Sequence, residues 1–322
     1  MRRTPRPGVR PGGNAMRRWA FRALMSSILG LSLIGSACGS SGGGSPASSS
    51  GNKGTITVAG FNFPESNILA NVYGGALHGI GYTVNYKPSL GAREVVAPAL
   101  ERGDIDMYIG YAATDLEFYN GAKGEATPDA AQTVTKLNTY LEPKSLKALT
   151  AAPAIDTNAF AVLKSGKYGK NTKLSDLTSV ASQMTLGGPP ECPQRPFCQL
   201  GLQKTYGLNF KGFKPLDSGG PLTKTALDQG DIDIGLIFSS DSAFSTGKYV
   251  QLQDDKHLQN ADNVVPIGRS KVFTSEVTTL LDKVSAKLTT DALIQMNKSS
   301  DVDKEDPGQI ATDWLKKNGF ST

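Results

Sequence analysis

The chain has 322 residues, 39% hydrophobic and 20% charged, so it is long enough for two packed lobes and is not composed like a disordered protein. Its formal net charge is +5, but seven arginines and no acidic residue lie within residues 1–37, and without them 34 − 7 = 27 basic residues face 29 acidic ones. The chain without these seven arginines has a formal charge of −2, and such a protein has no general electrostatic attraction for nucleic acid or anionic lipid.

Residues 1–37 have the pattern of a secretory signal peptide, with Met16 as a candidate true start. A basic region after Met16 is followed by an apolar stretch, and small residues then precede Cys38. The apolar stretch is shorter than the roughly 20 residues that a membrane-spanning helix needs. We therefore predict cleavage before Cys38 and attachment of lipid to its side chain. An ordinary signal peptide with an incidental cysteine is the alternative.

Residues 38–53 are predicted to form a flexible tether behind the lipid anchor. Nearly all of residues 39–52 are Gly, Ser, Ala and Pro, a composition that does not pack. The predicted location is the extracellular face of the cytoplasmic membrane, with the lipid holding the protein there.

Beyond the tether, strands alternate with helices. The patterns predict a strand at 55–59, a helix that begins at Pro64, a strand at 82–87, a helix at 93–102 and a strand at 105–110. This alternation is typical of βαβ units and predicts an α/β fold with a mostly parallel sheet.

An internal repeat predicts two lobes of similar build. Residues 87–111 recur as residues 214–238, and each copy contains a helix, a glycine and then a buried strand. The two strands end in aromatic residues, Tyr111 and Phe238. Because open α/β sheets bind ligands at the carboxyl ends of their strands, we expect these rings to line one cleft. The alternative is that the repeat is only a favourable turn and the rings belong to the core.

Two further cysteines, Cys192 and Cys198, are predicted to form a disulfide that closes a short loop. Two cysteines remain once Cys38 is assigned to the lipid, and in an exported chain an even number favours a disulfide. The two histidines, His78 and His257, lie far away in the sequence, so we predict neither a metal site nor a cofactor. The C-terminal part is predicted to be helical at 277–288 and after Asp306, with a polar connection at 299–305 between these helices.

Motifs typical of enzymes are absent from the sequence, and we predict a binding protein rather than an enzyme. Paired carboxylates, Asp104 with Asp106 and Asp231 with Asp233, could serve a glycosidase in principle. Each pair lies at the start of a predicted strand, away from the end where a ligand is expected. A secreted hydrolase on the same scaffold is the alternative.

Six segments carry a family pattern: 61–66, 99–106, 187–198, 215–221, 238–241 and 262–266. Together they resemble the substrate-binding proteins of glycine betaine, choline and carnitine importers, over the whole chain from residue 55. The resemblance implies a type II periplasmic-binding-protein fold, with two α/β lobes that close over an osmoprotectant. It also implies a monomer that works with separate ABC permease and ATPase subunits. We expect residues 54–156 plus 263–322 to form lobe 1, and residues 157–262 to form lobe 2.

The resemblance also implies roles for individual residues. Tyr111 and Phe238 match rings of an aromatic cage, which attracts a quaternary ammonium by cation–π contact. Thr114 matches a polar contact, and Arg195 matches an arginine that holds the ligand carboxylate with its planar fork. The residues predicted to contact the ligand are Phe61, Asn62, Tyr111, Thr114, Asp156, Asn158, Arg195 and Phe238.

Three departures from the family pattern leave the ligand open. Phe61 stands where many relatives carry lysine, Asn158 stands where relatives often carry a cage tyrosine, and another cage tyrosine is missing around 264–265. Glycine betaine, choline and carnitine stay as candidates, beside an uncharged polar solute or an amino-acid-like ligand. Phe61 and Phe238 could instead be buried packing residues, and Arg195 could only brace the disulfide loop.

Overall fold

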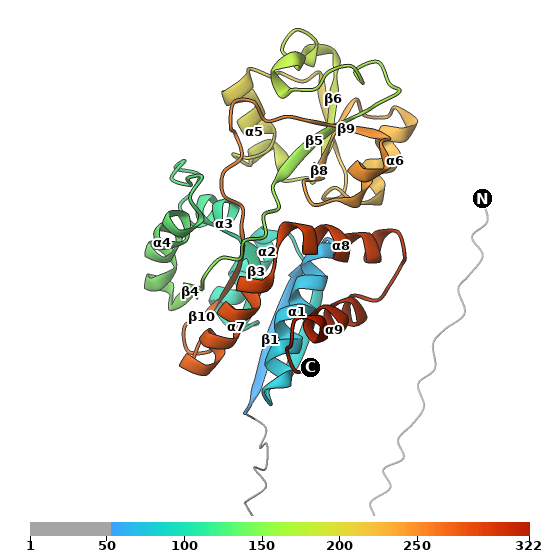
Figure 1. Cartoon of the computed structure of the whole chain (residues 1–322). Coiled ribbons are helices and arrows are strands. Elements are labelled where there is room, and N and C mark those ends of the chain that lie inside the picture. Colours follow the sequence, from blue (N-terminus) through green and yellow to red (C-terminus); the bar gives the residue numbers. More distant parts are fainter. Residues whose placement is uncertain (1–52) are drawn as a thin grey trace, which may run out of the picture. The chain divides into compact units, whose positions relative to one another are not determined.

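The computed structural model describes residues 53–322, so the predicted signal peptide, Cys38 and nearly all of the tether lie outside the described residues. The described chain forms two five-stranded sheets, each with helices packed on it (Figure 1). We call each sheet with its helices a lobe.

The first lobe is built on a sheet with the strand order β2-β1-β3-β10-β4. The first two strands run further than the sequence predicted, because each continues along its neighbour through a β-bulge between Ala59 and Phe61, which pairs with Gly91. The strands are β1 (Thr55–Phe61), β2 (Thr83–Gly91), β3 (Met107–Tyr111), β4 (Leu146–Ala148) and β10 (Val264–Arg269).

The second lobe is built on a sheet with the strand order β7-β6-β8-β5-β9, in which β6 and β8 occupy the places of β1 and β3. The similar order agrees with the repeat in the sequence. The strands are β5 (Asn158–Leu163), β6 (Thr185–Gly188), β7 (Gly212–Pro215), β8 (Ile234–Phe238) and β9 (Tyr249–Leu252).

Both sheets are mostly parallel, as predicted, but each contains one strand that runs against the other four. In the first sheet β10 runs antiparallel to both β3 and β4, and in the second sheet β5 runs antiparallel to both β8 and β9. These two strands follow directly on the segments that cross between the lobes. Each of them therefore begins at the end of its sheet that faces the other lobe. It runs in the opposite direction to the strands of the βαβ units.

The repeated unit has the predicted conformation in both lobes. Its helices end at Gly103 with a φ of 82° and at Gly230 with a φ of 74°, in the left-handed region that glycine adopts without strain. The strands that follow, β3 and β8, are almost entirely buried.

The repeat also explains the paired carboxylates. Asp106 accepts a hydrogen bond from the Thr57 N–H at 2.9 Å, and Asp233 accepts one from the Thr185 N–H at 2.8 Å. Each carboxylate therefore holds the start of the neighbouring strand.

Several helices begin where their capping residues predict. Asp306 accepts hydrogen bonds from the N–H groups of Gly308 and Gln309, and Pro307 occupies the first helical turn, so the last helix starts as expected. The predicted connection at 299–305 is partly wrong, because its first residues complete the helix α8. The helices are α1 (Pro64–Gly79), α2 (Arg93–Arg102), α3 (Ala112–Tyr119), α4 (Ala130–Leu141), α5 (Gln199–Gly201), α6 (Pro221–Gln229), α7 (Ser275–Lys287), α8 (Thr290–Asp301) and α9 (Pro307–Lys317).

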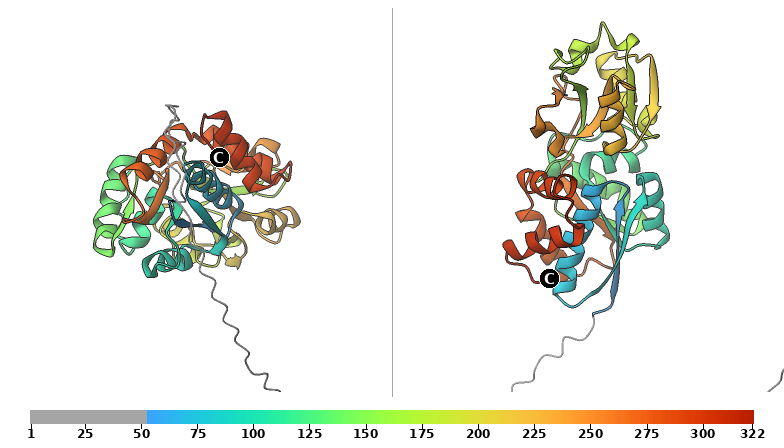
Figure 2. Two further views of the ribbon diagram at one scale, coloured as in Figure 1. Left: turned by 90° about the horizontal axis from the view of Figure 1, so that it is seen from below. Right: turned by 90° about the vertical axis from the view of Figure 1, so that its right-hand side faces the viewer.

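Each lobe has its own hydrophobic core, and the C-terminal helices join the first. In both views of Figure 2 these helices, drawn in red, lie beside α1, drawn in light blue. The chain passes between the lobes twice, before β5 and before β10, and Ile155 and Asn263 of these crossings pair as an isolated bridge.

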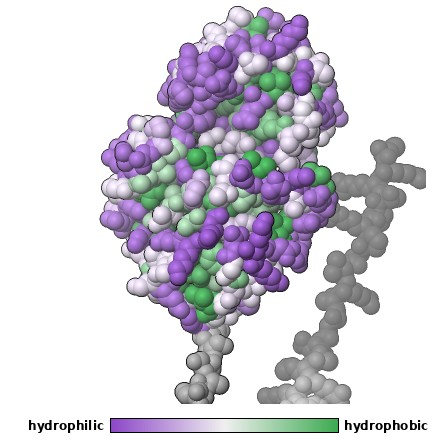
Figure 3. Space-filling model, viewed as in Figure 1, coloured by the Kyte–Doolittle hydropathy of each residue, from purple (hydrophilic) through white to green (hydrophobic). Residues whose placement is uncertain are grey.

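The face shown in Figure 3 is largely hydrophilic, with hydrophobic residues scattered in small groups. Within residues 53–322, every helix is too short or too polar to cross a bilayer.

Candidate functional site

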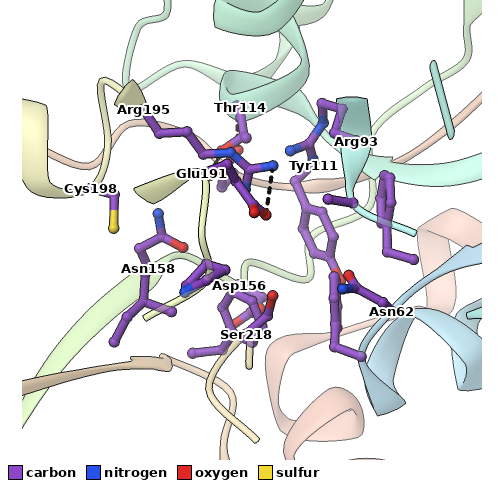
Figure 4. A pocket seen from close by; sticks show the side chains of 17 residues that line it. Asn62, Arg93, Tyr111, Thr114, Asp156, Asn158, Glu191, Arg195, Cys198 and Ser218 are labelled. Carbon is purple, nitrogen blue, oxygen red and sulfur yellow. Dashed lines mark hydrogen bonds and ion pairs between the residues drawn. The ribbon is translucent and has the colours of Figure 1, made fainter. Parts of the chain in front are cut away.

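A small pocket, with a cavity of about 50 Å³, takes its lining from both lobes. Tyr111 at the carboxyl end of β3 and Phe238 at the carboxyl end of β8 both line it, as the repeat predicted. Figure 4 shows Tyr111 and Asn62 on one side of this pocket, and Asn158 and Arg195 on the other. The structure brings all eight predicted ligand contacts into the lining: Phe61, Asn62, Tyr111, Thr114, Asp156, Asn158, Arg195 and Phe238.

The ring that joins the two lobes is Phe63, which the sequence analysis did not single out. Its centroid lies 6.1 Å from that of Tyr111 and 4.9 Å from that of Phe238. The three rings therefore form one continuous aromatic wall of the pocket. Phe63 is the N-cap residue of α1, two residues after the last residue of β1.

Phe61 stacks on Phe63, with ring centroids 5.8 Å apart, and extends the aromatic wall into the core of the first lobe. Its side chain is 2% exposed. The guanidinium carbon of Arg93 lies 5.0 Å from the ring centroid, so Phe61 already carries a cation on one face. Arg93, from the start of α2, also lines the pocket.

Asp115 holds Arg93 and the end of β3 in place through hydrogen bonds. This fully buried carboxylate accepts hydrogen bonds from Arg93 Nε at 2.7 Å, from the Tyr108 hydroxyl at 2.8 Å and from the Tyr111 N–H at 2.8 Å. Burial lowers the pKa of Arg93, but the charge and hydrogen bonds of Asp115 outweigh it and raise the pKa overall. A side chain at Gly110 would collide with the carboxylate, since its Cβ would lie 2.2 Å from Oδ2 of Asp115.

Glu65 is hydrogen-bonded to a tyrosine of the aromatic wall and to residues of both lobes. It accepts hydrogen bonds from the Tyr111 hydroxyl at 2.7 Å, from Ser240 Oγ of the second lobe at 2.6 Å and from Asn297 Nδ2 of α8 at 2.6 Å. Burial raises the pKa of Glu65, while these hydrogen bonds oppose the rise. The pKa of Tyr111 is also raised well above its ordinary value, by burial and then by the charge of Glu65.

Asp156, at the first crossing between the lobes, is a second buried acid beside the pocket. It accepts hydrogen bonds from Ser239 Oγ at 3.1 Å and from the Ser240 N–H at 2.9 Å. Burial, followed by the nearby charge of Glu65, raises its pKa well above the ordinary value. Asp156 therefore binds the end of β8 and adds a carboxyl group to the pocket lining.

Asp262, at the second crossing, is a third acid in the lining. It accepts hydrogen bonds from the Thr114 N–H at 2.7 Å and from Thr114 Oγ1 at 2.5 Å. Burial raises the pKa of Asp262 to about 6, against the effect of the Thr114 hydrogen bonds and the charge of Arg93. The side chain of Thr114, predicted as a polar contact, is thus hydrogen-bonded to Asp262. In the sequence, only the matched segment 262–266 pointed to this acid.

Arg195 forms an ion pair across the pocket mouth. Its Nη2 lies 2.8 Å from Oε2 of Glu94 in α2 of the first lobe. The same atom lies 3.2 Å from Oε1 of Glu191 in its own loop, the pair that the dashed line in Figure 4 marks. Cys192 and Cys198 are joined by a disulfide that closes this loop. Asn158 donates a hydrogen bond to the Phe197 carbonyl at 3.0 Å, in the same loop.

Residues 54–317 match the family model of the substrate binding domain of ABC-type glycine betaine transport systems. The chain belongs to this family. Members are the extracytoplasmic solute-binding subunits of ABC importers, so the chain binds a small solute and works with permease and ATPase subunits. The predicted family and α/β binding-protein fold are confirmed.

Two relatives and one solved structure illustrate the likeness. The carnitine transport binding protein OpuCC of Listeria monocytogenes is 27% identical over 309 residues, which cover 93% of this chain and 97% of the relative. The glycine betaine-binding protein YehZ of Escherichia coli is 26% identical over 269 residues, or 80% of this chain and 88% of the relative. A crystal structure of a glycine betaine/carnitine/choline ABC transporter protein shares the fold, with a TM-score of 0.63 at 21% identity over 82% of this chain and 97% of that one.

Proposed function

We propose that the pocket binds a quaternary ammonium osmoprotectant, such as choline, glycine betaine or carnitine, against the wall formed by Phe63, Tyr111 and Phe238. The contact of Phe63 with both other rings carries this proposal, because it makes a single aromatic surface from the two lobes. A quaternary ammonium has no N–H to donate, so ring faces rather than hydrogen-bond acceptors must attract it. Asp262, a buried acid beside the wall whose pKa is about 6, adds negative charge at neutral pH where the cation would lie.

The proposed mechanism is closure of two lobes around the solute. It assigns residues 54–156 plus 263–322 to lobe 1 and residues 157–262 to lobe 2, with the crossings beside Ile155 and Asn263 as the hinge. Support comes from the bonds that span the pocket, Glu65 with Ser240 and Glu94 with Arg195. The proposal includes no catalytic step, and the protein acts as a monomer.

The experiment compares choline and glycine betaine with their carbon isosteres, in which a tert-butyl group replaces trimethylammonium. Isothermal titration calorimetry on the mature protein is expected to show binding of at least one quaternary compound and an affinity about tenfold or more lower for its isostere. The shape is unchanged in this pair, so the difference reports the charge over the rings, at about 1.4 kcal/mol per factor of ten. Absence of binding by every quaternary compound, or equal affinity for the isosteres, would contradict the proposed function.

We also propose that the protein is held on the outer face of the cytoplasmic membrane by lipid on Cys38. The small residues before this cysteine and the Gly- and Ser-rich segment after it support the anchor. Replacing Cys38 by alanine is expected to move the protein from the membrane fraction to the medium or a soluble fraction, measured by immunoblotting. Retention of the variant in the membrane fraction after a high-salt wash would contradict a lipid anchor at this position.

A further inference from the structure

Both arginines in the pocket lining are already paired with carboxylates of the protein. Arg93 directs Nε and Nη2 at the two oxygens of Asp115, at 2.7 and 3.4 Å. Arg195 directs Nε and Nη2 at the two oxygens of Glu94, at 3.3 and 2.8 Å, and its Nη2 also lies near Glu191. An arginine holds a carboxylate best with two parallel bonds. A ligand carboxylate would therefore meet guanidinium groups whose charge is already neutralised and whose Nε–Nη2 side is occupied.

The charged groups around the pocket sum to a negative formal charge at neutral pH. Two arginines and four carboxylates give 2 − 4 = −2, with Asp156 and Glu65 left out because burial raises the pKa of each. A cation gains from this surplus, whereas a ligand carboxylate meets like charge at short range. The groups counted are Arg93, Arg195, Asp115, Glu94, Glu191 and Asp262.

Glu94 is ionised at neutral pH and therefore stays paired with Arg195. The hydrogen bonds and charge of Arg195 outweigh the effect of partial burial and lower the pKa of Glu94. The disulfide loop that carries Arg195 is thereby bound to α2 of the other lobe. This contact accounts for Arg195 without a ligand carboxylate.

Arg93 still has N–H groups for a ligand. Its side chain is 6% exposed, and within residues 53–322 its Nη1 makes no hydrogen bond. Since Arg93 lines the pocket, Nη1 can donate to a ligand oxygen. On a guanidinium whose charge Asp115 already neutralises, these N–H groups suit a neutral hydroxyl or ester oxygen.

We propose that the pocket prefers a quaternary ammonium alcohol or its ester, a cation with a neutral oxygen, over a zwitterion that carries a carboxylate. The preference rests on the function proposed above. Arg195 then serves to bridge the lobes through Glu94, rather than to hold a ligand carboxylate as the family resemblance implied.

The first test compares choline with glycine betaine, which share the trimethylammonium group and differ in hydroxyl against carboxylate. Calorimetry on the mature wild-type protein at neutral pH is expected to give an affinity for choline at least about tenfold higher than for glycine betaine. Equal affinities, or tighter binding of glycine betaine, would overturn the preference and leave the proposed function intact. If neither compound binds, the preference fails; if carnitine does not bind either, the proposed function fails with it.

The second test removes the Glu94 carboxylate from Arg195 by replacing Glu94 with glutamine, while Glu191 stays 3.2 Å from Nη2. The partly released guanidinium is expected to bind a ligand carboxylate, so the affinity for glycine betaine should rise about fivefold or more while that for choline stays or falls. A merely structural loss would weaken both ligands together. Glu101→Gln is the matched control, because Glu101 lies on the same helix and pairs with Lys144 at 2.9 Å outside the pocket lining. A ratio of affinities that stays unchanged in Glu94→Gln would argue against the proposal.

A third measurement uses pH. Asp262, whose pKa is raised to about 6, is faced by Thr114, by Arg93 of α2 and by Asp115 of α3. As the pH falls through this pKa, Asp262 takes up a proton and loses the negative charge that favours a cation. Choline affinity is therefore expected to fall severalfold between about pH 7.5 and about pH 5, by linkage of proton and ligand binding. An affinity for choline that rises on acidification would contradict a cation-selective pocket.

Discussion

Replacement of Tyr111 by alanine is expected to weaken binding of a quaternary ammonium ligand about tenfold to thirtyfold, with the fold retained. Loss of a desolvated cation–π contact of up to about 2 kcal/mol corresponds to this factor. Tyr111 makes two different contacts in the structure: its ring contacts Phe63, and its hydroxyl donates a hydrogen bond to Glu65. The alanine variant therefore loses both a ring of the wall and a link to the bond network between the lobes.

Two variants separate these effects. Tyr111→Phe keeps the ring and removes the hydroxyl, so its affinity should lie close to that of the wild type. Tyr140→Ala removes a half-buried ring on α4, which lies outside the pocket lining, and should leave binding unchanged. Calorimetry gives the affinities, and circular dichroism checks the fold. Full affinity in a folded Tyr111→Ala protein would remove this ring from the site.

Replacement of Asp115 by alanine is expected to lower the free energy of unfolding by about 3–5 kcal/mol, the usual cost of leaving a buried charge unpaired. The side chains of Arg93 and Asp115 are 6% and 0% exposed, so water cannot replace the lost partner. The Tyr108 hydroxyl and the Tyr111 N–H lose their acceptor as well. Urea unfolding followed by circular dichroism measures the change.

An exposed ion pair on the same lobe provides the control. Arg102 and Asp104 lie 2.8 Å apart with 62% and 51% of their side chains exposed, and Asp104→Ala should cost less than about 1 kcal/mol. The double variant Arg93→Met with Asp115→Ala should recover part of the stability, because it removes the unpaired charge. A small effect of Asp115→Ala, equal to that of Asp104→Ala, would show that the buried pair contributes little.

The repeat and the strand patterns predicted much of the site. Tyr111 and Phe238 could be placed at one cleft because a buried strand that ends in an aromatic residue occurs in both copies, and ligands bind at that end of such strands. The roles matched to Thr114, Asp156, Asn158 and Arg195 came from the family resemblance, and all four line the pocket. Their contacts with a ligand stay predictions.

The partners of these residues could not be read from the sequence. Thr114 meets Asp262 across 148 residues, and Glu65 meets Asn297 across 232. Arg195 was expected to face a ligand carboxylate, but the neighbouring lobe presents Glu94 to it. No local pattern reports such pairs, because each depends on how two distant segments pack.

The sequence by itself determined the two-lobe α/β plan and the end of each sheet where the pocket lies, since these follow from local periodicity and from a repeat within the chain, and its matched segments pointed to the family. Only the tertiary structure decided that β10 and β5 run antiparallel, that Phe63 joins Tyr111 to Phe238 in the aromatic wall, and that both pocket arginines are already paired. The physical reason is that side-chain direction and charge pairing are set by contacts between segments far apart in the chain. Those contacts form only when the lobes are packed.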